Sequence, residues 1–195
     1  ARQRHAIDTM QPVSPDSMMP SAGLRGFLRQ QTRDLHQAVD DRFSASGATT
    51  TRSGYRQFLS TMADMHAQFG HAADRAVERA GLAPRAGDHW QRLMADLGGH
   101  GVFPSVPVPG RHDPDVDAGV AYVLEGSALG AQLLLKQVRE ADIDGLGMGY
   151  LQSLCDERQT RWARYCRWLD TASVDEDGAV RGARSVFGAI LRRLD

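Results

Sequence analysis

The stretch Tyr122–Ala131, YVLEGSALGA, places two glycines in a segment whose other residues favour a helix. Each glycine inside a helix costs about 0.5 to 1 kcal/mol relative to alanine. At about 100° per residue, Gly119, Gly126 and Gly130 fall within about 40° of one another and form a stripe without side chains. Such a stripe lets a second helix or a flat ligand approach the backbone, and it also permits a kink. Taken alone, the stretch favours helix packing over a ligand site.

Amphipathic segments flank this stretch on both sides. Apolar residues recur at steps of three and four, as on one face of a helix. We predict helices over residues 21–43, with Ser21 as N-cap, and over 55–77, 88–97, with Asp88 as cap, 115–140, 150–172 and 180–194. No segment alternates with period two for long enough to make a strand. The sequence therefore predicts a single all-α domain over residues 21–195.

Two other segments lack this periodicity. Residues 1–20 contain proline, serine, methionine and glutamine without a pattern, and we expect a disordered arm there. The run GVFPSVPVPGRHDP at 101–114 is rich in proline and is predicted to be a surface loop.

Composition narrows the classes of partner. The chain of 195 residues has a formal net charge of -1 and a pI of about 6.7, so no global field attracts nucleic acid or an anionic membrane. No apolar run approaches the roughly 18 residues that span a bilayer, and the first residues lack the apolar middle of a secretory signal. We expect a cytoplasmic protein without a nucleic-acid or membrane partner, and leave its oligomeric state open.

One histidine stands out among seven. His36 projects about 80° from the centre of the apolar stripe at Leu28 and Leu35, on the shoulder between core and solvent. A neutral imidazole there could bind a metal while its other nitrogen finds a carboxylate or a carbonyl. A lone histidine at the edge of a helix is nevertheless typical of a structural residue.

Two segments together resemble a known family. The first is LRGFLRQQTRDLHQAVDDRF at 24–43, in which Thr32 and His36 are four residues apart, and the second is YVLEGSALGAQLLLKQV at 122–138. In this combination and order the chain resembles the haem oxygenase family, specifically its bacterial branch, over residues 21–195. The resemblance implies a helical fold in which haem is sandwiched between a proximal and a distal helix.

The resemblance also implies site residues. His36 matches the proximal ligand of the haem iron, and Gly126 and Gly130 match the distal glycines that lie over the haem. Further contacts to haem are expected from Arg29, Thr32, Tyr122, Val123 and the sole lysine, Lys136, with Arg29 and Lys136 placed to meet the propionates. Glycines on the distal side would leave room for O2 and for the edge of the ring that is attacked.

The implied reaction is the O2-dependent cleavage of haem to biliverdin, CO and ferrous iron, with haem as both substrate and cofactor. The electrons would come from an external donor, a ferredoxin or a reductase, because nothing in the chain resembles a flavin or nicotinamide site. Iron acquisition and the supply of a bilin to a phytochrome are both open as purposes. The sequence does not determine which meso carbon is cleaved.

Two positions depart from the family pattern. Many members carry aspartate after the first distal glycine, where this chain has Ser127, and a second glycine is common where it has Ala131. We expect Ser127 and backbone carbonyls to position water. Because of these two departures, the sequence does not determine the route of proton delivery or the tilt of the haem.

Three alternatives remain at this point. A di-iron carboxylate oxidase would need Glu-x-x-His motifs, and no glutamate in the chain is followed by histidine three residues later. His66 and His71 diverge by about 140° on a helix and make a poor metal pair. The other two are a non-catalytic haem-binding or haem-transfer protein on the same fold and a cofactor-free interaction module.

Overall fold

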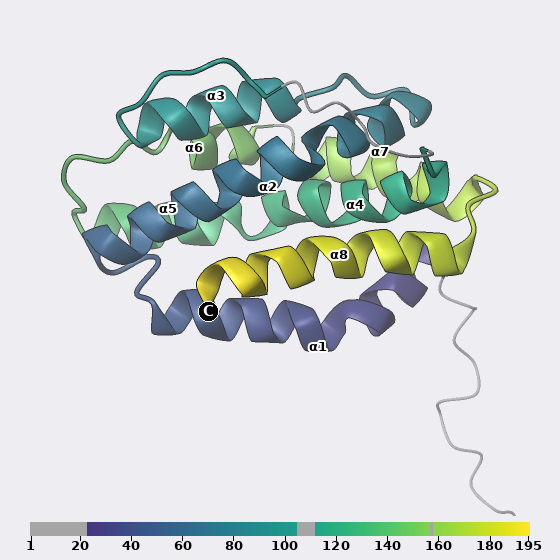
Figure 1. Ribbon diagram of the computed structural model, residues 1–195, viewed down its shortest axis with the longest axis horizontal. Helices are drawn as coiled ribbons and strands as arrows, with labels where there is room; N and C mark the ends of the chain where they lie inside the picture. The colour runs from purple at the N-terminus through teal and green to yellow at the C-terminus, as the bar shows by residue number, and fades with distance from the viewer. Residues whose placement is uncertain (1–22, 105–111, 157) are drawn as a thin grey trace, which may run out of the picture.

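The computed structural model of the chain describes residues 23–104, 112–156 and 158–195. The predicted arm at 1–20, Ser21 as an N-cap and most of the proline-rich loop lie outside these residues. The described residues contain helices and no strand, which confirms the all-α prediction (Figure 1). The helices are α1 (Leu24–Ala45), α2 (Arg52–Arg79), α3 (Ala86–Asp96), α4 (Pro114–Gly126), the short 3-10 helix η2 (Ser127–Leu129), α5 (Ala131–Glu140), α6 (Gly149–Cys155), α7 (Arg158–Thr171) and α8 (Glu176–Leu194).

Glycines bring α4 and α8 into backbone contact. A Cβ on Gly119 of α4 would overlap the carbonyl oxygen of Ala179 in α8, and a Cβ on Gly182 of α8 would overlap that of Val116 in α4. Any larger residue at these two positions would push the helices apart. The α4–α8 pair is therefore the most intimate helix contact of the fold.

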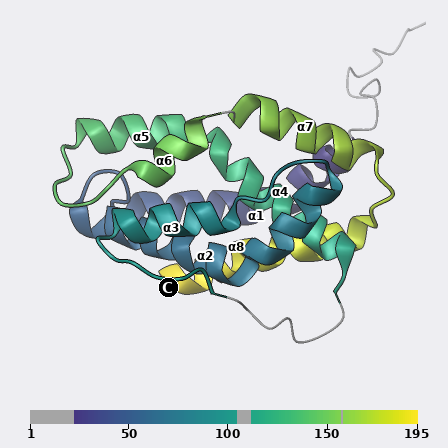
Figure 2. The same cartoon turned by 90° about the horizontal axis from the view of Figure 1, so that it is seen from above.

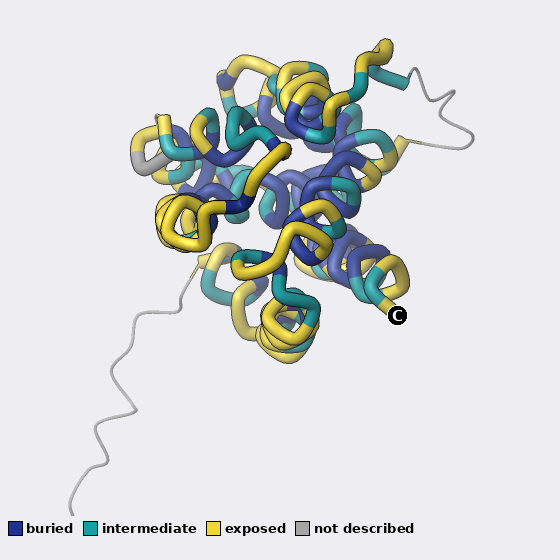
Figure 3. The backbone as a smooth tube through the Cα atoms, turned by 90° about the vertical axis from the view of Figure 1, so that its left-hand side faces the viewer, coloured by how far each residue is buried: buried dark blue, intermediate teal, exposed yellow. Residues whose placement is uncertain are grey.

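The core has two parts that share α2. One part joins α2 to α1, α4, α7 and α8, and the other joins α2 to α3, η2, α5 and α6. Figure 3 shows the buried segments in the middle of the array with exposed segments around them. Fully buried members include Leu28, Val77, Tyr165 and Val186 in the first part and Leu59, Leu93, Val138 and Leu151 in the second.

The helices α1 and α5 rest on different partners. The guanidinium of Arg184 in α8 donates to the carbonyl oxygen of Gln31 in α1 at 2.7 Å, and α5 packs on α6. Figure 1 shows α1 and α8 side by side, whereas Figure 2 places α5, α6 and α7 along the opposite side of the molecule from α2 and α8. Few contacts, at most, join α1 directly to α5.

The continuous helix predicted for 115–140 is interrupted. Between Gly126 and Gly130 the α-helix gives way to the 3-10 helix η2. The axes of the segments Pro114–Leu129 and Ala131–Glu140 meet there at 44°. Glycine at both ends of the 3-10 turn explains the break, since neither position favours a straight helix. The sequence indicated a possible kink, and the structure places it between Gly126 and Gly130; we call this segment, both glycines included, the bend.

The single helix predicted for 150–172 is wrong, because α6 ends at Cys155 and α7 begins at Arg158. The backbone of Asp156 is extended, with φ of -65° and ψ of 141°. No glycine or proline marks this break in the sequence. The start of α3 also differs, because Asp74 of α2 accepts hydrogen bonds from the backbone N–H groups of Arg85 and Ala86, at 2.9 and 3.1 Å, in place of a cap from Asp88.

Among the described residues, no single helix is long and apolar enough to cross a bilayer. The bent pair of Pro114–Leu129 with Ala131–Glu140 meets the length and composition test only when both segments are taken together. Within this fold α4 is largely buried, and it packs against α2 and α8.

Candidate functional site

His36 lies on the exposed side of α1. Its side chain is 64% exposed, and its Nδ1 is 3.0 Å from Oδ2 of Asp40, one turn later. The ring also meets Phe187 of α8 edge to face, with centroids 5.7 Å apart. A carboxylate at Nδ1 favours the tautomer with the proton on that nitrogen and leaves the lone pair of Nε2 available to a metal.

Two arginines precede His36 on the same side of α1. Arg29 is two turns earlier and Arg25 one turn before that, and both are exposed. Burial raises the pKa of Tyr122 in α4, and the positive charges of Arg29 and Arg25 counteract part of that rise. The fold therefore brings these arginines within electrostatic range of the Tyr122 hydroxyl.

An apolar face without a protein cover lies just beyond the bend. The side chains of Leu129 and Leu133 are 53% and 61% exposed, and they flank Gly130. A Cβ on Gly130 would meet nothing within 4 Å. We call Leu129, Gly130 and Leu133 the distal face. Large apolar side chains exposed together in this way commonly mark a binding surface.

The bend is held from α7. Arg161 donates two hydrogen bonds to the carboxylate of Glu125, at 2.7 and 2.8 Å, and the two side chains are only 9% and 15% exposed. The next residue, Trp162, fills the space beside Gly126, where a Cβ would lie 3.4 and 3.5 Å from two indole carbons. The indole also stacks at a tilt on Tyr122, with ring centroids 5.5 Å apart. The space that a side chain at position 126 would enter is therefore filled by Trp162.

Ser127 joins a buried polar group. Its hydroxyl donates to the carbonyl oxygen of Leu124 at 2.7 Å. Burial raises the pKa of Tyr150, and a hydrogen bond with the Ser127 side chain opposes that rise. The Tyr150 hydroxyl lies 3.3 Å from Nε2 of His66, whose ring meets that of His89 edge to face. Burial lowers the pKa of His66 to about 4 and that of His89 to about 2, so both rings are neutral at pH 7.

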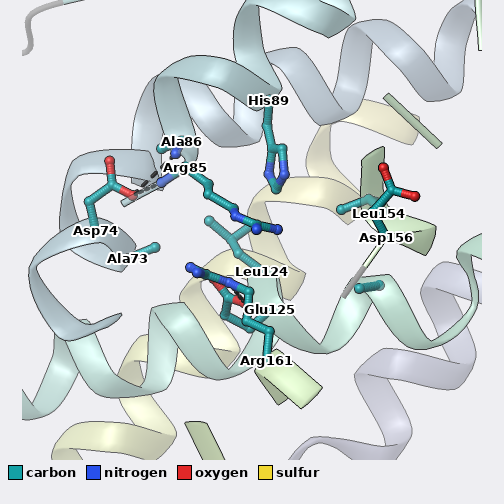
Figure 4. A pocket seen from close by; sticks show the side chains of 11 residues that line it. Ala73, Asp74, Arg85, Ala86, His89, Leu124, Glu125, Leu154, Asp156 and Arg161 are labelled. Atoms are coloured by element: carbon teal, nitrogen blue, oxygen red, sulfur yellow. Dashed lines mark hydrogen bonds and ion pairs between the residues drawn. The ribbon is translucent and has the colours of Figure 1, made fainter. Parts of the chain in front are cut away.

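A polar pocket adjoins the bend between α2, α3, α4 and α7 (Figure 4). It has an empty volume of about 470 Å³, part of which is open to solvent. Its ionisable lining consists of Asp74, Arg85, His89, Glu125, Asp156 and Arg161. Within this lining, Glu125 and Arg161 are paired with each other.

Among the predicted site residues, His36 and Arg29 share the exposed side of α1, and Gly130 is on the distal face. The other predicted residues are placed differently. Thr32 is buried, and its hydroxyl donates to the carbonyl oxygen of Leu28 at 2.8 Å. Val123 is a core residue at 8% exposure. The side chain of Lys136 is 70% exposed, and its Nζ lies 3.7 Å from Oε1 of Glu140.

Sequence reasoning missed four neighbours of these residues. Asp40 is four residues after His36, and the i,i+4 rule for helices could have identified it. Phe187, Arg161 and Trp162 lie in other helices, so the spacing of residues along α1 or α4 could not predict them. Among the described residues, no group of three or more His, Cys, Asp or Glu side chains could hold a metal ion.

The chain is similar in structure to the NO- and CO-bound haem oxygenase from Neisseria meningitidis. The TM-score is 0.71 at 22% sequence identity, over 89% of this chain and 91% of that one. No family model matches the sequence, and no curated protein matches it either. At this identity the likeness establishes the fold, which is the all-α fold of a haem oxygenase and confirms the predicted fold class.

Proposed function

We propose that this protein is a haem oxygenase, which cleaves the haem ring with O2 to biliverdin, CO and ferrous iron. The observation that carries the proposal is the exposed His36, with Nδ1 on Asp40 and Nε2 without a described partner, on a fold shared with a haem oxygenase. No other candidate ligand in the described residues combines exposure with such a second partner on its own helix.

The residues present fit haem in three respects. Haem needs an axial nitrogen, which Nε2 of His36 would supply. It needs apolar contact on its flat faces, and Leu129 and Leu133 are exposed beside Gly130. Its propionates need cations, and Arg29 and Arg25 lie two and three turns before His36 on the same side of α1.

Bound haem would supply the iron that binds and activates O2 and the ring that is cleaved. The protein's own residues would hold the haem and shape the space around it. Asp40 fixes the tautomer and orientation of His36, because its carboxylate accepts a hydrogen bond from the Nδ1–H group of the imidazole. Gly130 keeps a side chain away from the distal side, where nothing within 4 Å occupies its Cβ position.

Ser127 is the candidate for handling protons and water at the bend. Its hydroxyl now donates to Leu124 and is linked to the Tyr150 hydroxyl. Serine is a weaker acid than the aspartate found in many family members, so we expect proton delivery to depend on water held by backbone carbonyls.

Other parts of the proposal concern partners. The electrons would come from a separate donor, a ferredoxin or a reductase, and the protein would work in the cytoplasm. The biliverdin formed could provide the bilin of a phytochrome, and the released iron could serve nutrition. A non-catalytic haem-binding protein is the second candidate, favoured by the absence of a carboxylate at position 127.

An absorption time course tests the proposal. The purified protein is mixed with one equivalent of hemin and then given ascorbate or a ferredoxin system in air. We expect a Soret band that decays into the broad red absorption of biliverdin. A Soret band that persists with every donor would favour the non-catalytic candidate.

The matched pair of variants is His36→Ala and His100→Ala, since His100 is also an exposed histidine. We expect His36→Ala to weaken hemin binding at least tenfold and His100→Ala to leave it unchanged. If both variants bind hemin like the wild type, His36 is not the ligand, and if the wild type forms no Soret band, the likeness ends at the fold.

A further inference from the structure

Helix α7 touches the bend at two consecutive residues. Arg161 holds Glu125, the residue before Gly126, through two hydrogen bonds of 2.7 and 2.8 Å. Trp162 lies against Gly126 itself, at the distance of ordinary van der Waals contact for a Cβ. One residue of α7 therefore fixes the charge beside the bend, and the next fills the space beside its first glycine.

The ion pair is a geometric restraint more than a source of stability. Both partners are largely removed from water, with side-chain exposures of 9% and 15%, and the desolvation of such a pair offsets most of its attraction. Its two parallel hydrogen bonds allow only a narrow range of relative positions, which a lysine in place of arginine would not reproduce. The pair is thus suited to specify where Glu125 lies.

The position of the distal face follows from that of the bend. η2 is one short turn between Gly126 and Gly130, and α5 leaves it at 44° to the preceding segment. Neither glycine has a side chain that could pack, so the angle of the turn depends on contacts made by the neighbouring residues. Within the turn, the Ser127 hydroxyl bonds to the Leu124 carbonyl oxygen and Ala128 is buried. Just before the turn, α7 restrains Glu125 and Gly126.

We propose that Arg161 and Trp162 are positioning residues that set the angle of the bend, and with it the height and tilt of the Gly126–Gly130 backbone over the haem. This inference rests on the proposed function for its haem part. Neither residue touches the reacting atoms, and both act through the backbone that Glu125 and Gly126 carry.

The first test uses the haem-free protein. The double variant Glu125→Leu/Arg161→Met removes both charges at similar volume, so that no charge is left unpaired in the core and the fold is kept. Hydrogen exchange of peptides covering 126–131 should be at least tenfold faster than in the wild type. Peptides of α8 should be unchanged, as should every peptide in the control Arg167→Met, an exposed residue of α7.

A second variant, Arg161→Lys, keeps the charge and loses the paired geometry. It should show an intermediate gain in exchange at 126–131, whereas a purely electrostatic role would leave exchange at the wild-type rate. Unchanged exchange at 126–131 in the double variant overturns the inference, whether or not the protein binds haem.

The second test uses the hemin-loaded protein reduced under CO. In the double variant, the C–O stretching band should shift or broaden relative to the wild type, while hemin affinity changes less than threefold because His36 is untouched. An unaltered C–O band with faster exchange would refute the haem part and leave α7 as a brace of the fold. If the wild type binds no hemin, the proposed function fails, and the exchange experiment still decides the role of Arg161.

Discussion

Gly119 and Gly130 have the same angular position on a straight helix, yet they meet opposite surroundings. Gly119 is pressed against α8, where a Cβ would overlap the Ala179 carbonyl oxygen, whereas a Cβ on Gly130 would meet nothing within 4 Å. Gly126 is intermediate, with Trp162 at contact distance. A row of glycines therefore serves helix packing at one end and an open face at the other, and residue type alone does not tell which.

The comparison separates two costs of a side chain. At the packed end a side chain costs stability, because the backbones of two helices must move apart. At the open end it costs nothing in the folded chain and matters only to whatever occupies the distal face.

The largest effect is expected at Gly119. Gly119→Leu should destabilise the protein by about 4 kcal/mol or more, because the side chain cannot enter the contact with α8 without displacing a helix. Urea unfolding followed by circular dichroism measures the change. The matched substitution Gly130→Leu should alter the unfolding midpoint little, and equal losses in the two variants would contradict the division between packed and open ends.

The second effect depends on pH and contrasts buried His66 with exposed His36. Burial lowers the pKa of His66 to about 4, so the unfolded chain, with a histidine pKa near 6.5, binds more protons between these values. The stability from the neutral ring is complete above pH 6.5 and falls as the pH drops towards 4, by roughly 3 kcal/mol in all.

Urea midpoints measured from pH 7.5 to 4.5 check this slope. His66→Phe should make it shallower, leaving the contribution of His89, whose pKa is lowered further, to about 2, whereas His36→Ala should leave it unchanged. A wild-type slope in the His66→Phe variant would show that protonation of other groups controls acid unfolding.

A third effect, confined to ligand binding, is expected at Asp40. Asp40→Ala removes the partner of His36 Nδ1, and such partners of metal-binding histidines are typically worth tenfold or more in affinity. Hemin titration should show a roughly tenfold weaker complex, while the free energy of unfolding changes by less than about 0.5 kcal/mol, as for most exposed sites. Asp41→Ala, at the neighbouring exposed carboxylate, is the control and should bind hemin normally.

The smallest effect on stability is expected at Gly130. Its φ of -84° and ψ of -14° are helical, so Gly130→Ala should be neutral or stabilise the fold by about 0.5 kcal/mol. Gly130→Leu should keep hemin bound through His36 and suppress conversion to biliverdin, because the side chain would enter the distal side. Wild-type turnover of the leucine variant would count against an open face at the reaction site.

Much of the fold could be predicted from residue spacing. The apolar stripes of α1, α2 and α8 predict helix ends within a few residues of those observed, because each stripe is a local pattern with the period of the helix. The gap between α6 and α7 escaped, since extended backbone at Asp156 carries no proline or glycine. Asp74 as the cap of α3 also escaped, because it lies in the preceding helix.

The candidate site was predictable in part for the same reason. The position of His36 on the shoulder of α1 follows from angles along one helix, whereas the exposure of Gly130 does not. The partner of Glu125 does not, because Arg161 is 36 residues away and reaches it only when α7 packs beside α4. Thr32 was expected to contact haem, but it is buried, and its hydroxyl donates to the carbonyl oxygen of Leu28 in the same helix.

By itself, the sequence determined where helices run, that His36 stands at the edge of an apolar stripe, and that three glycines share one side of a helix. Only the tertiary structure decided which of those glycines is packed and which is open, and which residues of α7 hold the bend between them. Helix periodicity is set by neighbours along the chain, whereas the surroundings of a glycine are set by whichever distant helix packs there.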